Sequence, residues 1–180
     1  MKAKMIGKVV LGASLMFTSA YVQESTFAQS ARGFLTAPRA NANPGPNSNC
    51  RKISANGVQV FDPATGIISG PVSNSGLLDG DLTDVINFGA GFVFTPDPTV
   101  VAYTTDLTIT TNHGQLKASA VTTQSIITAQ GAEWGQINPN SSTGRFAGST
   151  GMISIVFKAV GDPAVGPYEA QITADICFAQ

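Results

Sequence analysis

Residues 99–111 (TVVAYTTDLTITT) alternate between apolar and polar side chains, and this alternation restricts the fold more than any other feature of the sequence. One face of the extended chain carries four large apolar side chains: Val101, Tyr103, Leu107 and Ile109. A period of two in β-branched and aromatic residues predicts a long strand with one face in water. The turn signal at 112–115 (NHGQ) and the resumed run at 116–123 (LKASAVTT) predict a hairpin.

Shorter runs elsewhere in the chain repeat this pattern. No stretch shows a sustained apolar stripe with a period of 3.6 residues, so we expect about seven to nine strands and no long helix. We favour an antiparallel up-and-down β-barrel of about eight strands, because its first and last strands can pair and leave no free edge. A β-sandwich is the alternative. The further predicted strands cover residues 58–61, 67–69, 82–87, 91–95, 152–157 and 168–178.

Residues 1–28 have the organisation of a secretory signal peptide. Three lysines within the first eight residues precede an apolar stretch at 9–20 that is too short for a permanent membrane span. Small residues allow cleavage after Ala28, which we favour, or after Ala20. An ordinary N-terminal helix is the alternative. No later apolar stretch is long enough for a transmembrane helix, so we expect a secreted or periplasmic protein.

Residues 29–49 are rich in Pro, Asn and Ala and contain few large apolar residues. Such a segment buries too little surface to offset its ordering entropy, so we predict a flexible leader followed by one domain over residues 50–180. Cys50 opens that domain and Cys177 nearly closes it. Two cysteines in an oxidising compartment predict a disulfide that ties the first strand to the last, with free or intermolecular thiols as the alternative.

The composition excludes several classes of function. Only 12% of the residues are charged and the formal net charge is -1, which leaves no excess of Lys and Arg for binding nucleic acid. Because the chain has one His, a multi-His zinc site is impossible, and a Ser–His or Cys–His mechanism would need His113, which lies in a predicted turn. The chain has no P-loop or dinucleotide-binding fingerprint, so we predict no cofactor.

A segment at residues 142–151 (SSTGRFAGST), followed by the predicted strand at 152–157, is more specific than the strand pattern. Its residues Thr143, Gly144, Phe146 and Gly151 resemble the T-G-x-F-x-x-x-x-G run before a strand in the allene oxide cyclase and dirigent superfamily of eight-stranded barrels. The resemblance implies a barrel with Phe146 plugging one end and a cavity that holds an apolar ligand in the family's enzymes. The catalytic carboxylate of the cyclases and the acidic residues of dirigent proteins have no residue-by-residue counterpart here, so no activity is carried over.

Two further segments contain candidate ligand-binding residues. Asp79, Asp81 and Asp84 place three carboxylates within six residues, which suits Ca²⁺, although the segment lacks the Glu of an EF-hand at its twelfth position. A solvated turn is the alternative for these three residues. Trp134 is expected in the core, with stacking on a sugar ring as the alternative.

Two functions remain after these exclusions. One is a non-enzymatic structural or interaction protein of the cell envelope or extracellular space; the other is a barrel that binds a small apolar molecule or a glycan. In the second, the cavity is expected to be lined by Tyr103, Leu107, Phe157 and Ile172. The family's barrels suggest a homo-oligomer, and a cyclase-like isomerase is a more distant alternative. We favour the filled, structural barrel, because six phenylalanines need burial: Phe88, Phe92, Phe94, Phe146, Phe157 and Phe178.

Overall fold

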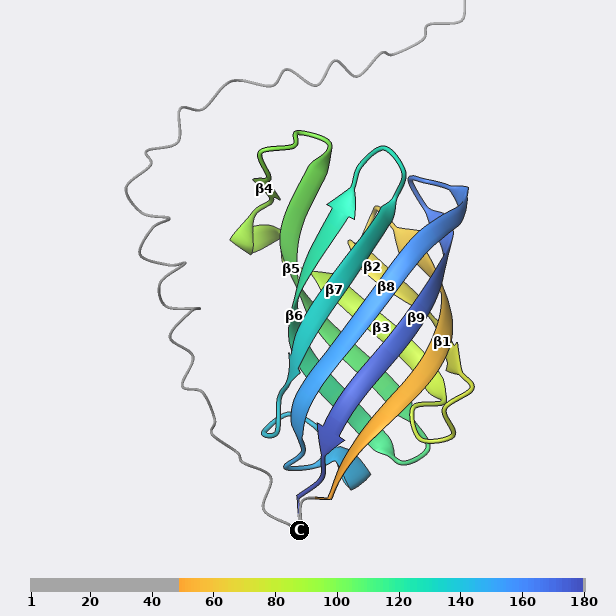
Figure 1. The fold of residues 1–180 in the computed structure, drawn as a ribbon, viewed down its shortest axis with the longest axis vertical. Helices are drawn as coiled ribbons and strands as arrows, with labels where there is room; N and C mark the ends of the chain where they lie inside the picture. Colours follow the sequence, from red (N-terminus) through yellow and green to blue (C-terminus); the bar gives the residue numbers. More distant parts are fainter. Residues whose placement is uncertain (1–48, 180) are drawn as a thin grey trace, which may run out of the picture. The chain divides into compact units, whose positions relative to one another are not determined.

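The computed structural model describes residues 49–179. The predicted signal peptide, its two cleavage sites and residues 29–48 of the predicted leader lie outside the described residues, so they stay predictions. Nine strands and two short 3₁₀ helices make up the described part (Figure 1). They are β1 (Cys50–Asp62), β2 (Ile67–Ser73), β3 (Gly80–Ile86), η1 (Phe88–Ala90), β4 (Val93–Phe94), β5 (Val100–Thr111), β6 (Gly114–Ser125), β7 (Gln130–Ile137), η2 (Gly144–Phe146), β8 (Thr150–Asp162) and β9 (Gly166–Cys177).

Eight of the strands close into an antiparallel barrel. Each strand of the ring pairs with the next along the chain, β3 pairs with β5, and β9 pairs with β1 to close it. The two-residue strand β4 pairs with the start of β5 and stands apart from the barrel wall (Figure 1). The predicted up-and-down barrel of about eight strands is thus confirmed, and the sandwich alternative is excluded.

Most of the observed strands are longer than the predicted ones, whereas β4 and β5 are shorter. The predicted strand at 99–111 corresponds to β5, and the run at 116–123 lies within β6. β7 has no counterpart among the predicted strands. Its inward positions are Gly131, Glu133, Gly135 and Ile137, so two glycines and a carboxylate interrupt the apolar period.

The end of the barrel where β1 begins and β9 ends, the lower end in Figure 1, is filled; we call it the closed end. Cys50 and Cys177 are paired across β1 and β9 and form the predicted disulfide. The β7–β8 connection folds over this end and carries Phe146, which is fully buried, as is Leu78 from the β2–β3 loop. The core at this end also contains Leu107, Ile109, Ile153, Ile172 and Ile176.

The opposite end carries the β1–β2, β3–β5, β6–β7 and β8–β9 connections; we call it the open end. Phe88, Phe92 and Phe94 lie on its rim and are 54%, 44% and 62% exposed. The expectation that these rings fill the barrel is therefore wrong, because residues 87–99 leave the wall between β3 and β5. Phe92 lies against Tyr103, with 5.4 Å between ring centroids, so the rim aromatics continue into the barrel.

Candidate functional site

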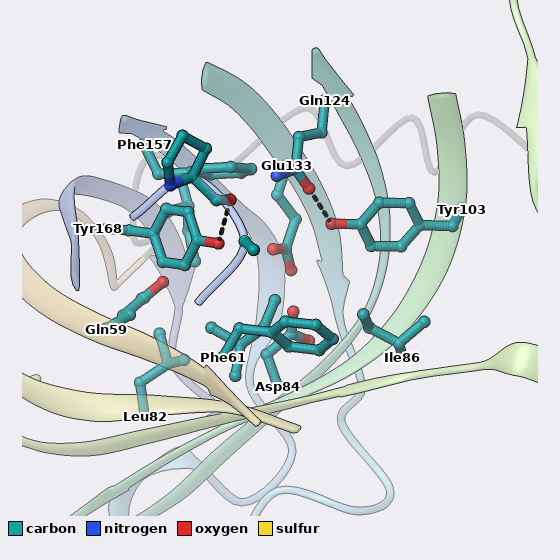
Figure 2. Close-up of a pocket in the computed structure, with 14 residues that line it drawn as sticks. Gln59, Phe61, Leu82, Asp84, Ile86, Tyr103, Gln124, Glu133, Phe157 and Tyr168 are labelled. Carbon is teal, nitrogen blue, oxygen red and sulfur yellow. Dashed lines mark hydrogen bonds between the residues drawn. The ribbon is translucent and has the colours of Figure 1, made fainter. Parts of the chain in front are cut away.

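A cavity of about 120 Å³ lies inside the open end of the barrel. Four aromatic rings, from Phe61, Tyr103, Phe157 and Tyr168, surround it (Figure 2). An apolar cavity of about 150 Å³ in another protein admits benzene, so this somewhat smaller space sets an upper limit of about one ring on the enclosed part of a ligand. The rest of the lining consists of Gln59, Ile68, Leu82, Asp84, Ile86, Gln124, Glu133, Ile155, Pro163 and Ala164.

Two carboxyl groups point toward one another across the middle of this cavity (Figure 2). Asp84 lies on β3, and Glu133 lies on β7, three strands further round the barrel. The two residues are only 2% and 4% exposed. Glu133 Oε1 accepts a hydrogen bond of 3.2 Å from Thr105 Oγ1 on β5. The open end therefore buries two acids where the closed end buries isoleucine and leucine.

Burial raises the pKa of both acids. Loss of hydration is the largest cause for Asp84, and the nearby Thr105 hydroxyl and Glu133 carboxyl group oppose it. Loss of hydration is also the largest cause for the raised pKa of Glu133, and the negative charge of Asp84 adds to it. Ionising both groups would place two like charges in a poorly solvated space, so the pair shares a proton near neutral pH.

Two buried polar atoms of the cavity lining lack a hydrogen-bonding partner among the amides, hydroxyls and carbonyl groups of the described residues. Asp84 Oδ1 receives no hydrogen bond from an amide or hydroxyl within residues 49–179, which leaves a protonated Glu133 as its internal donor. Gln59 Nε2 finds no acceptor in the same part of the chain. Most buried polar groups in proteins are paired. Gln59 Nε2 is therefore a donor available to a ligand, and Asp84 Oδ1 becomes an available acceptor when the Glu133 proton is displaced.

The polar ends of the tyrosines are fixed by hydrogen bonds. Tyr103 Oη donates to Gln124 Oε1 at 2.8 Å, and Tyr168 Oη donates to the Pro163 carbonyl oxygen at 3.0 Å. Loss of hydration raises the pKa of both hydroxyls, so they stay neutral. None of the described residues that line the cavity is Lys, Arg or His, so no cationic side chain there balances the acids.

The structure divides the four predicted lining residues between the two ends. Tyr103 and Phe157 line the cavity, whereas Leu107 and Ile172 are packed in the core toward the closed end. All four face inward, as their periodicity indicates. Alternation predicts which side of the sheet a residue faces, but it does not predict how far along the barrel axis that residue lies. In this barrel, the position along the axis decides whether an inward side chain lines the cavity or packs in the core.

The structure does not bring the three predicted calcium ligands together. Asp79 is exposed in the β2–β3 loop, where its carboxylate accepts hydrogen bonds from the amide and hydroxyl of Ser75. Asp81 is exposed, whereas Asp84 points into the barrel, because odd and even positions of β3 face opposite sides. Within residues 49–179 no cluster of three or more His, Cys, Asp or Glu side chains could hold a metal ion. The three residues therefore do not form a calcium site: Asp84 lies inside the barrel, whereas Asp79 and Asp81 lie on its surface.

The residues of the family-like motif lie at the closed end, away from the cavity. Thr143 and Gly144 pack on the β5–β6 turn, and a Cβ at Gly144, whose φ is 60°, would collide with the carbonyl oxygen of His113. Phe146 is buried below this contact, and Gly151 has a φ of 137° at the start of β8. The segment shapes the closed end and contributes no group to the candidate site.

Sequence reasoning missed the carboxyl pair as a site. It considered Asp84 only as a calcium ligand and placed Trp134, rather than its neighbour Glu133, inside the barrel. Trp134 is 49% exposed on the outer face of β7, so its predicted core position is wrong. The sequence does contain a signal for Asp84. It lies two residues from both Leu82 and Ile86, so alternation along the strand places all three side chains on the inward face.

Comparison of the chain with known protein families, with curated proteins and with solved structures gave no match. In the described part of the chain, no helix has both the length and the apolar character needed to cross a membrane. The cavity and its two acids are the features of the described residues that bear on function.

Proposed function

We propose that the protein is exported and that the open end of its barrel binds a small, mainly apolar molecule. The observation that carries this proposal is the cavity, an interior space that side chains leave empty in a barrel packed at its other end. Barrels of eight strands are just wide enough either to be filled by side chains or to hold one small ligand. The alternative in which the core is filled throughout is therefore less well supported than a binding role.

The composition of the lining supports the same proposal. Ligand sites are typically concave and mostly apolar, with a few polar groups that orient the bound molecule. Here aromatic and aliphatic side chains form most of the wall, and the polar positions are few: Gln59, Asp84, Gln124 and Glu133. Phe88 and Phe92, which lie 5.8 Å apart between ring centroids, offer an apolar route from the rim to Tyr103.

Export is supported by the disulfide, since such bonds persist in oxidising compartments. The intact mass of the protein secreted by its own host tests this part of the proposal. We expect a chain that begins at Gln29 and is two hydrogens lighter than its reduced form. A full-length cytoplasmic product with free thiols would contradict export.

Binding is best tested with a pair of variants on one strand. Ile68 lines the cavity, whereas Ile67 precedes it on β2 and points to the other side of the sheet. Ile68→Trp adds volume inside the cavity, and Ile67→Trp is the matched control. The probes are toluene, 2-phenylethanol and 2-phenylethylamine, and the measurement is the shift of the Tyr103 and Phe157 ring signals by NMR.

At least one probe is expected to bind the wild-type protein and Ile67→Trp but not Ile68→Trp. Thermal melting shows whether both variants fold, so that lost binding is not confused with lost structure. Failure of all three probes to bind the wild-type protein at about 10 mM would overturn the proposed function, since this limit excludes even millimolar affinity.

An interaction role is a second candidate, favoured by the apolar side chains on the outside of the barrel. The outer faces of β1, β7 and β8 expose Val58, Val60, Trp134, Met152 and Val156, each by about half. Native mass spectrometry tests this role and the predicted homo-oligomer together. A dimer or larger species that dissociates in Val156→Asp, but not in Ile127→Asp, which changes an exposed residue of the β6–β7 loop, supports it. The relation to the allene oxide cyclase and dirigent superfamily likewise stays a proposal.

A further inference from the structure

The structure narrows the chemical class of the ligand, and this inference rests on the proposed function. We propose that the open end binds a small organic cation, an amine with an apolar body of about one ring, whose ammonium group lies between Asp84 and Glu133. The inference is carried by the position of two buried acids in the middle of a mainly apolar cavity.

The charges that face the cavity are all of one sign. Asp84 on β3 and Glu133 on β7 are its carboxyl groups, and Tyr103 on β5 and Tyr168 on β9 are its other titratable groups. The lining residues of β1, β2, β6 and β8 are uncharged. Asp106, on the outer face of β5, adds a negative field at Asp84. A cation is therefore attracted and an anion is repelled.

The basic residues of the barrel do not offset this charge from within. Lys158, for example, lies on the outer face of β8 and pairs with Glu169 of β9 at 3.4 Å, with both side chains more than half exposed. An ion pair in that position is screened by water. The two internal acids thus have no cationic partner among the residues that line the cavity.

The hydrogen-bonding positions match an ammonium group. Asp84 Oδ1 lacks a donor among the described amides and hydroxyls, and Glu133 Oε1 accepts one hydrogen bond from Thr105. An ammonium group has several donors and can reach both carboxylates, whereas an alcohol has one. The aromatic rings around the cavity add to the attraction, because the face of an aromatic ring is negative.

Other cations fit this site less well. Ca²⁺ takes six to eight oxygen ligands, whereas the cavity lining offers two carboxylates and two glutamine side chains among mainly apolar and aromatic groups. No cluster of three or more potential ligand side chains exists in residues 49–179. An organic cation needs fewer polar contacts and uses the apolar wall for its body.

Binding of a cation displaces the proton that the acids share. Without ligand, that proton keeps the pair at about one negative charge. When an ammonium group lies between the acids, both are stabilised as carboxylates and one proton is released to solvent. The affinity for an amine is therefore expected to rise with pH, by at most tenfold per pH unit, until Glu133 is ionised without ligand. An alkylamine keeps its own charge up to a pH of about 10.

The experiment compares three probes of the same shape and different charge: 2-phenylethylamine, 2-phenylethanol and phenylacetate. Titration calorimetry of the wild-type protein at pH 7 in phosphate and in HEPES, neither of which contains a primary amine, measures affinity and proton release, because the two buffers have different ionisation enthalpies. We expect the amine to bind about tenfold more tightly than the alcohol, and phenylacetate to bind most weakly. Up to one proton is expected to be released on binding of the amine and none on binding of the alcohol.

Two neutral replacements test the assignment to the acid pair. Glu133→Gln and Asp84→Asn keep the shape of each side chain and are each expected to weaken amine binding about tenfold while changing alcohol binding less than about twofold. Glu133→Gln also removes the released proton. The matched control is Glu169→Gln, which neutralises an exposed acid on the outer face and should leave both affinities unchanged.

The outcomes separate this inference from the proposed function. Equal affinity for amine and alcohol, a preference for phenylacetate, or amine binding without proton release would overturn the inference and leave the binding role intact. Absence of binding by all three probes would overturn the binding role, and the inference with it. If a neutral variant does not fold, the pH dependence and proton release of the wild-type protein still decide the question.

Discussion

The two ends of the barrel are built from the same eight strands but use their inward positions differently. At the closed end, Phe146 and Leu78 from two loops cover a core of aliphatic side chains, and the disulfide ties β1 to β9. At the open end, the inward positions of β3 and β7 carry Asp84 and Glu133, and these acids line a cavity that side chains leave empty. Burying acids costs stability that the apolar end has to supply. The difference shows how a small barrel can keep a destabilising polar site: packing is concentrated at one end, which leaves the other end available for binding.

The largest expected effect of a change at the closed end comes from the disulfide. Replacing both Cys50 and Cys177 by Ser should lower the free energy of unfolding by about 4 to 5 kcal/mol, because the bond closes a loop with a sequence separation of 127 residues. Urea unfolding of the oxidised wild type and the double variant measures this. Where the variant is still folded, binding of 2-phenylethanol should be unchanged, since the cavity lies at the other end. A loss of binding from the folded variant would contradict this independence.

A comparison of two phenylalanines sharpens the contrast between the ends. Phe146→Ala removes a fully buried ring and should cost about 3 to 5 kcal/mol, as is typical for a core Phe. Phe157→Ala removes a half-buried ring from the wall of the existing cavity and should cost about half as much or less, because less surrounding packing is lost. Urea unfolding of both variants provides the test. Equal costs would mean that the open end is packed as tightly as the closed one.

The acids should make stability depend on pH in a direction opposite to that of a paired surface carboxylate. Because the pKa values of Asp84 and Glu133 are raised in the folded state, this state binds more protons than the unfolded chain, and stability falls as the pH rises above about 4. Glu133→Gln removes one of the two groups. We expect this variant to match the wild type near pH 4 and to exceed its stability by about 1 to 2 kcal/mol at pH 8.

Chemical unfolding at several pH values measures this difference. Glu169→Gln, which changes an exposed acid outside the barrel, is the control and should shift stability by less than about 0.5 kcal/mol at every pH. A gap between Glu133→Gln and the wild type that shrinks toward pH 8 would show that the acids are not destabilised by burial.

Period-two alternation in residues 99–111 and the cysteines at the two ends of the domain predicted an all-β fold whose first and last strands are linked, and favoured a barrel over a β-sandwich. The position of the site could not be predicted in the same way. Hydrophobicity alone assigned Phe88 and Phe94 to the core, yet they lie on a segment that leaves the barrel wall. Tyr103 and Leu107 share a face, and only the three-dimensional level separates the cavity from the filled core.

The sequence-based expectation and the structure differ most in the register of β7. Trp134→Ala, the substitution that tests this register, has the smallest expected effect on stability. β7 is paired on both sides, with Glu133 opposite Thr122 of β6 and Ile155 of β8, and this pairing turns Glu133 inward and Trp134 outward. Trp134→Ala should therefore cost less than about 1 kcal/mol, whereas Ile137→Ala, which truncates an inward residue of the same strand, should cost about 2 to 5 kcal/mol.

Trp134 is the only tryptophan in the chain, so its fluorescence reports the same register without mutation. Iodide should quench it in the folded protein, and 2-phenylethylamine should leave its emission unchanged, because the ring lies outside the wall that encloses the cavity. A cost above about 3 kcal/mol for Trp134→Ala, together with protection from iodide, would place the ring inside the barrel. Because neighbouring residues of a strand face opposite sides, that result would also move Glu133 to the surface and remove one of the two acids from the open end.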